Sequence, residues 1–65
     1  MQLQINGEER NVACTTLAEL LTQLAYTSAA VATAVDGEFV PRTARDTFTL
    51  YQGMRIDIVA PIQGG

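Results

Sequence analysis

This chain has 65 residues and a net charge of −3, with a single cysteine and no histidine or lysine. That length makes one domain, and the missing histidine and second cysteine exclude an internal disulfide and the common zinc sites. Its scattered arginines argue against nucleic acid or an anionic membrane as partner. The sequence has no long apolar run and no signal peptide, so we expect a cytoplasmic protein, and its single cysteine means that it folds by packing alone.

Residues 1–13 have the pattern of a β-hairpin. Apolar residues alternate with glutamines over residues 1–5, which is typical of a half-buried strand. Asn6-Gly7 is the dipeptide most favoured in a type I′ turn, and it predicts a return strand over residues 8–13. Cys14 continues one face of that strand, and we interpret it as a small buried hydrophobic residue rather than a reactive thiol.

A helix of about ten residues is predicted next, over residues 16–25. Thr16 and Glu19 have the spacing of a capping box, in which each side chain accepts a hydrogen bond from the other residue's backbone. Four leucines then recur on one helical face: Leu17, Leu20, Leu21 and Leu24. This stripe could bind a partner, but packing against a sheet is the better interpretation.

A second hairpin is predicted after the helix. Residues 31–35 alternate, Asp36-Gly37 is another hairpin-type turn, and residues 38–40 form the return strand. Pro41 ends that strand because proline cannot donate to a ladder, and residues 42–46 predict a polar loop or a single helical turn.

The last part of the chain predicts two further strands. Phe48 and Leu50 alternate with threonines over residues 47–50, and Gln52-Gly53 turns the chain. Residues 54–58 then show the clearest alternation in the sequence.

The order of these elements predicts an α+β fold, with one main helix packed on one face of a mixed sheet. If the helix crosses over the sheet, the first and last strands pair in parallel at its centre, which is the ubiquitin-like β-grasp arrangement. The C-terminal end of this last strand then lies at the border of the sheet, where the chain leaves into solvent. We therefore expect a domain over residues 1–60 and a flexible tail over residues 61–65.

The chemistry of the chain is concentrated at its Gly64-Gly65 end. The side chains include no nucleophile–base pair, and the carboxylates fit a solvated surface, so we expect no catalysis and no bound metal or cofactor. A Gly-Gly end offers an unhindered carboxylate, and the five residues after Ala60 can reach about 17 Å when extended. A carboxylate is a poor electrophile, so for transfer it must first be activated, typically as a mixed anhydride with AMP at an ATP-using partner, and a sulfur donor can then displace AMP. The alternative is a frayed end without function.

The whole chain resembles the ThiS family, the sulfur carriers of thiazole formation in thiamine biosynthesis. The most discriminating segments are Gly-Glu-Phe-Val-Pro-Arg over residues 37–42 and the Pro-Ile-Gln-Gly-Gly end over residues 61–65. Met54, where the family often has aspartate, is a minor departure. The resemblance implies that Gly65 is adenylated by a ubiquitin-activating-like enzyme that uses ATP, is converted to a thiocarboxylate with sulfur from a donor protein, and donates that sulfur to thiazole synthase.

Three alternatives remain open at this stage: the small subunit of molybdopterin synthase, a ubiquitin-like protein modifier, and an interaction module without terminal chemistry. For partner binding by the monomer we expect contacts from Pro61, Ile62, Gln63 and the glycines, entering a narrow channel. Phe39 and Val40, with Leu50, either form an exposed apolar patch for the partner or belong to the core.

Overall fold

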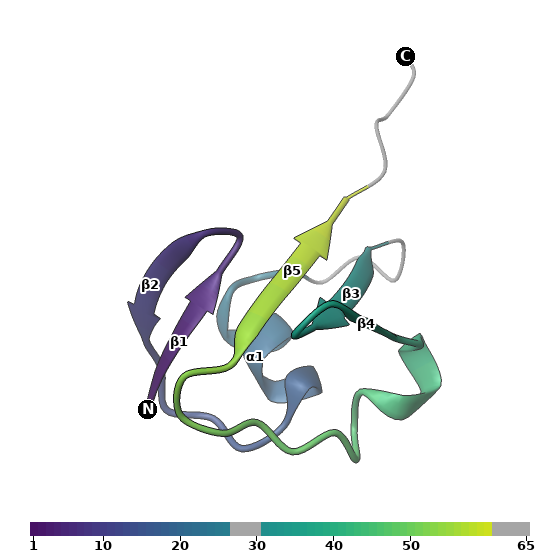
Figure 1. Cartoon of the computed structure of the whole chain (residues 1–65). Helices are drawn as coiled ribbons and strands as arrows, with labels where there is room; N and C mark the ends of the chain where they lie inside the picture. Colours follow the sequence, from purple (N-terminus) through teal and green to yellow (C-terminus); the bar gives the residue numbers. More distant parts are fainter. Residues whose placement is uncertain (27–30, 61–65) are drawn as a thin grey trace.

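The computed structural model describes residues 1–26 and 31–60, and within these ranges the chain folds into a five-stranded sheet with one α-helix (Figure 1). The elements in chain order are β1 (Gln2–Ile5), β2 (Glu8–Asn11), α1 (Leu17–Gln23), β3 (Ala32–Val35), β4 (Glu38–Val40), a 3-10 helix (Arg42–Ala44) and β5 (Arg55–Val59). The strand order in the sheet is β2-β1-β5-β3-β4. β1 and β5 pair in parallel at the centre and the other pairs are antiparallel, which confirms the predicted β-grasp fold.

Both predicted hairpin turns have the backbone that their sequences favour. Asn6 and Gly7 have φ of 51° and 79°, and Asp36 and Gly37 have φ of 51° and 85°. A type I′ turn requires positive φ at both central residues, and its twist matches that of the flanking strands. Each turn thereby fixes the register of its hairpin, with Ile5 opposite Glu8 and Val35 opposite Glu38.

The hydrophobic core lies between α1 and one face of the sheet. The leucine stripe of α1 faces inward, since Leu17, Leu20 and Leu21 are buried and Leu24 is half-buried. Alternate strand residues and three residues from connecting segments complete the core: Leu3, Ile5, Val12, Val31, Val35, Val40, Leu50, Ile56 and Ile58. The predicted capping box begins the helix, because Thr16 Oγ1 accepts from the Glu19 N–H and Glu19 Oε1 accepts from the Thr16 N–H.

The predicted strand over residues 47–50 is wrong. Only Thr49 pairs, in an isolated bridge with Thr16, although Leu50 is buried and Phe48 is half-buried. The alternation is real but comes from packing against the core: the Leu50 N–H donates to the Thr15 carbonyl and the Leu17 N–H to the Phe48 carbonyl, which joins two loops without a ladder.

Two element ends also differ from the prediction. α1 ends at Gln23 because Ala25 takes a left-handed backbone with φ of 65°, and the Ala25 and Tyr26 N–H groups donate to the Thr22 and Leu21 carbonyls. That pair of hydrogen bonds is a Schellman motif, which closes a helix. β2 ends at Asn11, which lies opposite Gln2. Beyond that pair the Val12 N–H still donates to the Met1 carbonyl at 2.8 Å, and the Met1 ammonium donates to the Val12 carbonyl at 2.7 Å.

Candidate functional site

The site expected from the sequence begins where β5 ends. Pro61, Ile62, Gln63, Gly64 and Gly65 lie outside the described residues, and with them the predicted flexible tail. What the structure describes is the base of this segment. β5 is the central strand of the sheet, hydrogen-bonded to β1 on one side and to β3 on the other, and it ends at Val59, followed by Ala60 (Figure 1).

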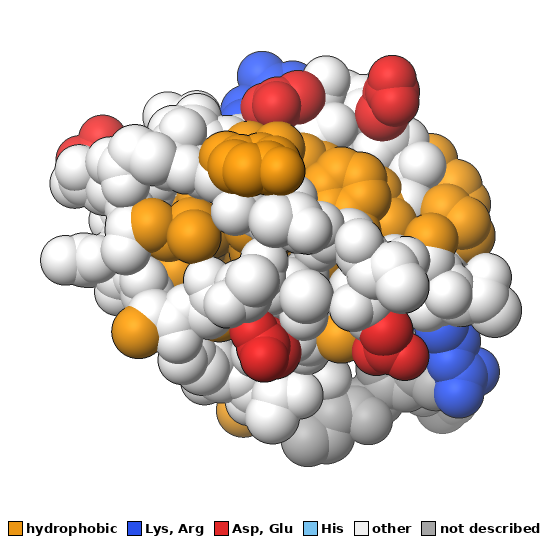
Figure 2. All heavy atoms as spheres, turned by 90° about the horizontal axis from the view of Figure 1, so that it is seen from below, with side chains coloured by type: hydrophobic (Ala, Val, Ile, Leu, Met, Phe, Trp, Pro, Cys, Tyr) orange, Lys and Arg blue, Asp and Glu red, His pale blue; other side chains and the backbone are white. Residues whose placement is uncertain are grey.

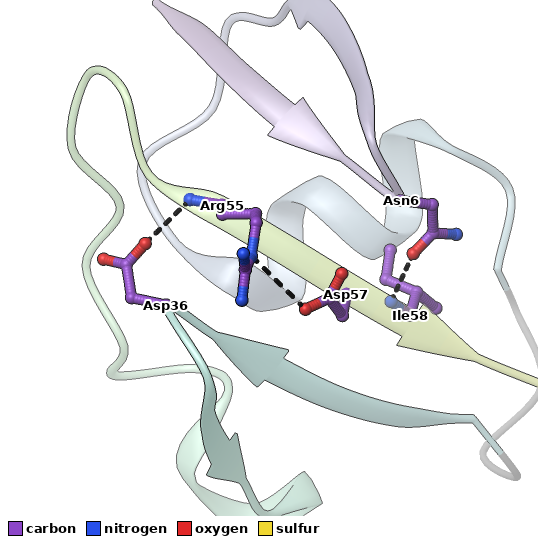
Figure 3. Close-up of polar contacts among 5 residues, drawn as sticks. All are labelled: Asn6, Asp36, Arg55, Asp57 and Ile58. Atoms are coloured by element: carbon purple, nitrogen blue, oxygen red, sulfur yellow. Dashed lines mark hydrogen bonds and ion pairs between the residues drawn. The ribbon is translucent and has the colours of Figure 1, made fainter.

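Both hairpin turns contact β5 through a side chain, from opposite sides (Figure 3). The Oδ1 atom of Asn6 accepts a hydrogen bond of 2.7 Å from the Ile58 N–H. The Oδ1 atom of Asp36 accepts one of 2.9 Å from the Arg55 N–H. The turn residues therefore hold the two ends of β5, Asp36 where the strand begins and Asn6 where it is about to leave the sheet.

The polar side chains of β5 contribute little to this anchoring. Arg55 Nε lies 3.7 Å from Asp57 Oδ2, with side chains 55% and 41% exposed. An ion pair as exposed as this stabilises a protein by at most about 1 kcal/mol and is screened by salt. The position of β5 is set by backbone hydrogen bonds and by the burial of Ile56 and Ile58.

The sheet face that turns away from α1 carries the other alternate residues of the strands. We call it the open face, and its side chains are those of Gln2, Gln4, Glu9, Asn11, Ala32, Ala34, Phe39, Arg55, Asp57 and Val59. Phe39 is 70% exposed and Val59 is 63% exposed. Ala32 lies opposite Val59 and Ala34 opposite Phe39, so these four residues form a continuous apolar strip, here the open-face patch, beside the end of β5.

The open-face patch agrees only in part with the residues that the sequence suggested. Phe39 is on the surface, whereas Val40 and Leu50 are 3% and 2% exposed and belong to the core. Their side chains face α1 and its flanking loops, so they cannot supply a surface contact. Val59 was missed, although the alternation in β5 signals it: if Ile56 and Ile58 face the core, Val59 must face the other way.

Other exposed apolar side chains lie at the opposite end of the molecule. Tyr51, in the loop before β5, is 63% exposed, and Met1 is 37% exposed. Seen from below, this end shows a band of hydrophobic side chains with acidic side chains on either side (Figure 2). β5 runs away from this band, which therefore lies at the end of the domain opposite Ala60 (Figure 1).

Cys14 packs against the core, as the sequence suggested, but it is half-buried rather than buried. Burial raises the pKa of the thiol, the nearby Glu19 carboxylate raises it further, and the N-terminal ammonium lowers it. Since the thiolate is the reactive form of cysteine, this environment disfavours a nucleophilic role. Glu19 itself has a lowered pKa because its carboxylate accepts hydrogen bonds from the Thr15 and Thr16 N–H groups.

Within residues 1–26 and 31–60, no group of three or more histidine, cysteine, aspartate or glutamate side chains is placed to hold a metal ion. None of the helices described is long and apolar enough to cross a membrane.

Comparison with known proteins supports both the family and the fold. A sequence model described as the ThiS family matches residues 3–65. The crystal structure of a thiamine biosynthesis protein (ThiS) from Geobacter metallireducens is similar, with a TM-score of 0.85 and 29% identity over 100% of both chains. A solution structure of a thiamine biosynthesis protein from the same organism gives a TM-score of 0.82 and 28% identity over 100% of this chain and 88% of that one. No curated protein matches the sequence significantly.

Proposed function

The chain belongs to the ThiS family, the small sulfur carriers of thiamine biosynthesis, and from this premise we propose that its Gly65 carboxylate is the group that carries the sulfur. A partner enzyme adenylates Gly65, sulfur from a donor protein replaces AMP, and the resulting thiocarboxylate gives its sulfur to thiazole synthase. The domain is a co-substrate of these enzymes, and ATP is bound by the adenylating partner rather than by the carrier.

The observation that supports this proposal best is the place of β5. The strand that leads into residues 61–65 is the central strand, with bonded neighbours on both sides and Ile56 and Ile58 buried beneath it. A reactive group on a glycine arm needs such a base, because the partner must align the carboxylate with its own groups. A reacting atom misplaced by about 1 Å can lose roughly 10²-fold in rate.

The steps themselves place few demands on the domain. An oxygen of the Gly65 carboxylate attacks the α-phosphorus of ATP and releases pyrophosphate, which turns a poor electrophile into an acyl adenylate. Sulfur delivered at the level of hydrosulfide then attacks the carbonyl carbon, AMP leaves with the bonding electron pair, and loss of the S–H proton gives the thiocarboxylate. Glycine has no Cβ beside that carbon, so Gly65 leaves the attack unhindered and Gly64 fits a channel that excludes water.

The open-face patch is the surface that we assign to the partner's docking site. Val59 on β5 is one residue from Ala60, and Ala32 and Ala34 on β3 connect it to Phe39 on β4. The residues after Ala60 reach at most about 17 Å, so an enzyme that takes in Gly65 must come close to this end of the sheet. Exposed aromatic side chains are typical of the desolvated centre of an interface.

An extended chain end tests the proposal. One alanine added after Gly65 moves the reacting carbonyl by roughly 3.4 Å and should abolish function without changing the melting temperature. The readout is growth without thiamine of a strain that lacks its own carrier, with a molybdenum-cofactor-deficient strain in parallel. Intact mass should show the exchange of oxygen for sulfur only in the unextended protein.

The result that overturns the proposal is growth supported by an extended protein whose mass proves it unprocessed. Rescue of the molybdenum-cofactor strain alone would assign the carrier to the other sulfur-transfer pathway. A protein attached through Gly65 in place of sulfur would identify a modifier.

A further inference from the structure

Asn6 has two separate roles in the structure. As the first central residue of a type I′ turn it has φ of 51°, which asparagine tolerates better than most residues. It also continues the parallel ladder between β1 and β5, which has its last pair at Ile5 and Ile56. The Asn6 N–H donates to the Ile56 carbonyl at 2.9 Å, and its Oδ1 then accepts from the Ile58 N–H at 2.7 Å.

The side-chain oxygen therefore takes the place of a backbone carbonyl. In an uninterrupted parallel ladder the backbone carbonyl of Asn6 would accept from the Ile58 N–H. Here the chain has already turned toward β2 at Asn6, and the side-chain oxygen accepts instead. Without Asn6 Oδ1, the Ile58 N–H, two residues before Ala60, would lose this hydrogen bond on the β1 side of β5. On the other side, Ala32 still pairs with Val59.

We propose that Asn6 is a positioning residue for the reaction at Gly65, because it fixes the direction in which β5 leaves the sheet. This inference rests on the proposed function. Gly65 is seven residues beyond Ile58, and without the Asn6 contact the segment that the partner must align would start from a less well fixed strand. A less well fixed strand end lowers the fraction of time in which the carboxylate is aligned, and a misplacement of about 1 Å can already cost roughly 10²-fold in rate.

The chain contains a matched control for this role in Asp36. Asp36 also has φ of 51° before a glycine, and its Oδ1 also accepts from a β5 N–H, that of Arg55. Arg55 is at the start of β5, so the Asp36 bond fixes the end of the strand that is remote from Gly65. If substitutions at Asn6 and Asp36 lower the rate at Gly65 equally, the cause is a general loss of sheet stability. If only the substitution at Asn6 lowers it, the cause is the direction in which β5 leaves the sheet.

Four variants separate the acceptor from the turn. Asn6→Gly and Asp36→Gly keep a turn that accepts positive φ and remove only the side-chain acceptor, at a similar entropic cost in the unfolded chain. Asn6→Asp and Asp36→Asn keep both the turn preference and an Oδ1 atom. The conservative variants therefore test whether restoring the acceptor restores the effect.

The measurement is pyrophosphate release by the host's adenylating enzyme, with ATP saturating and the carrier varied, together with amide hydrogen exchange of β5. Removing one hydrogen bond should speed exchange at Ile58 in Asn6→Gly, and at Arg55 in Asp36→Gly, by roughly 3- to 10-fold. Asn6→Gly should lower kcat by a similar factor of roughly 3 to 10 and leave KM within about twofold, since the open-face patch is intact. Asn6→Asp and both Asp36 variants should keep the wild-type kcat.

The possible failures are distinguishable. No pyrophosphate release from the wild-type carrier overturns the proposed function. With an active wild type, an unchanged kcat in Asn6→Gly, or an equal loss in Asp36→Gly, overturns the positioning role alone. A loss in Asn6→Asp equal to that in Asn6→Gly also overturns it, because the acceptor would then be irrelevant.

Discussion

The two faces of the sheet are built from the same strands but differ sharply in the exposure of their apolar side chains. In β5, Ile56 and Ile58 on the covered face are 0% and 5% exposed, whereas Val59 on the open face is 63% exposed. In β4 the neighbours Val40 and Phe39 differ in the same way, at 3% and 70%. Because successive strand residues point to opposite faces, one stretch of sequence specifies both the core and the surface of the domain.

If the proposed docking site is right, this difference in exposure predicts that stability and partner binding can be changed independently. A substitution on the covered face should act through the free energy of unfolding, and one on the open-face patch through partner affinity. The predictions below test this separation.

The largest loss is expected from Leu20→Ala. Leu20 is 0% exposed and lies at the centre of the helix face that packs on the sheet, so the cavity should cost about 2–5 kcal/mol in the free energy of unfolding. Denaturant melts measure it, with Cys14→Ala as the milder control because Cys14 is only half-buried. The opposite ranking would show that the core does not depend on the leucine stripe.

A second large loss of stability is expected from replacing Arg45, a buried charged residue that is hydrogen-bonded to Thr33 on the covered face. Arg45 is 7% exposed; its Nη2 donates to the Val31 carbonyl at 2.6 Å and its Nε to Thr33 Oγ1 at 3.1 Å, while Thr33 Oγ1 donates to the Val40 carbonyl at 2.8 Å. Arg45→Met keeps much of the side chain's length but leaves the Val31 carbonyl without this donor.

We expect Arg45→Met to cost about 2–3 kcal/mol, since hydrogen bonds from a charged donor are among the stronger ones. Thermal and denaturant melts measure the loss, and Arg42→Met, at an exposed position in the 3-10 helix, is the control. Equal stability of Arg45→Met and the wild type would mean that the guanidinium contributes no more than an apolar side chain there.

Arg45 also shows what the sequence could not reveal. Hairpins, the capping box and the leucine stripe depend on neighbouring residues, so local chemistry predicts them. The bonds of Arg45 join residues twelve and fourteen positions away, and nothing around Arg45 in the sequence signals its burial. The same limit explains residues 47–50, where alternation cannot distinguish a paired strand from a loop packed on the core.

For the candidate site, the sequence suggested Phe39 as a surface residue but did not identify the open face or Val59. Phe39 and Val40 were grouped because both are apolar neighbours, and only the register of β4 on β3 separates them. The acceptor role of Asn6 could not be read from the sequence either. Its turn preference explains the residue so well that no second role is needed to account for it.

A smaller effect, of opposite sign, is expected at the end of α1. Ala25 has φ of 65° at the position of the Schellman motif that glycine usually occupies. Ala25→Gly should relieve that strain and stabilise the protein by about 0.5–1 kcal/mol, even after the added flexibility of the unfolded chain. A rise in melting temperature checks it. Ala18→Gly, within α1, should instead destabilise, and a loss in both variants would contradict the assigned helix end.

The smallest effect on stability is expected on the open face. Phe39→Ser should change the free energy of unfolding by no more than about 0.5 kcal/mol, because the ring is 70% exposed. Its affinity for the adenylating enzyme should fall clearly, as measured by calorimetry or by KM. Tyr51→Ser, at the other end of the molecule, is the control. If it weakened binding as much as Phe39→Ser, the partner would not be confined to the end of the sheet where β5 leaves.

The central place of β5 also has a mechanical consequence. The hydrogen bonds on its two sides lie across the strand, toward β1 and β3, so a pull on the chain beyond Ala60 loads them in shear. An edge strand pulled outward would instead lose its bonds one after another. The domain should therefore resist traction on its own C-terminal segment far better than its modest size suggests. A partner that draws that segment inward works against a strand which yields only when several bonds break together.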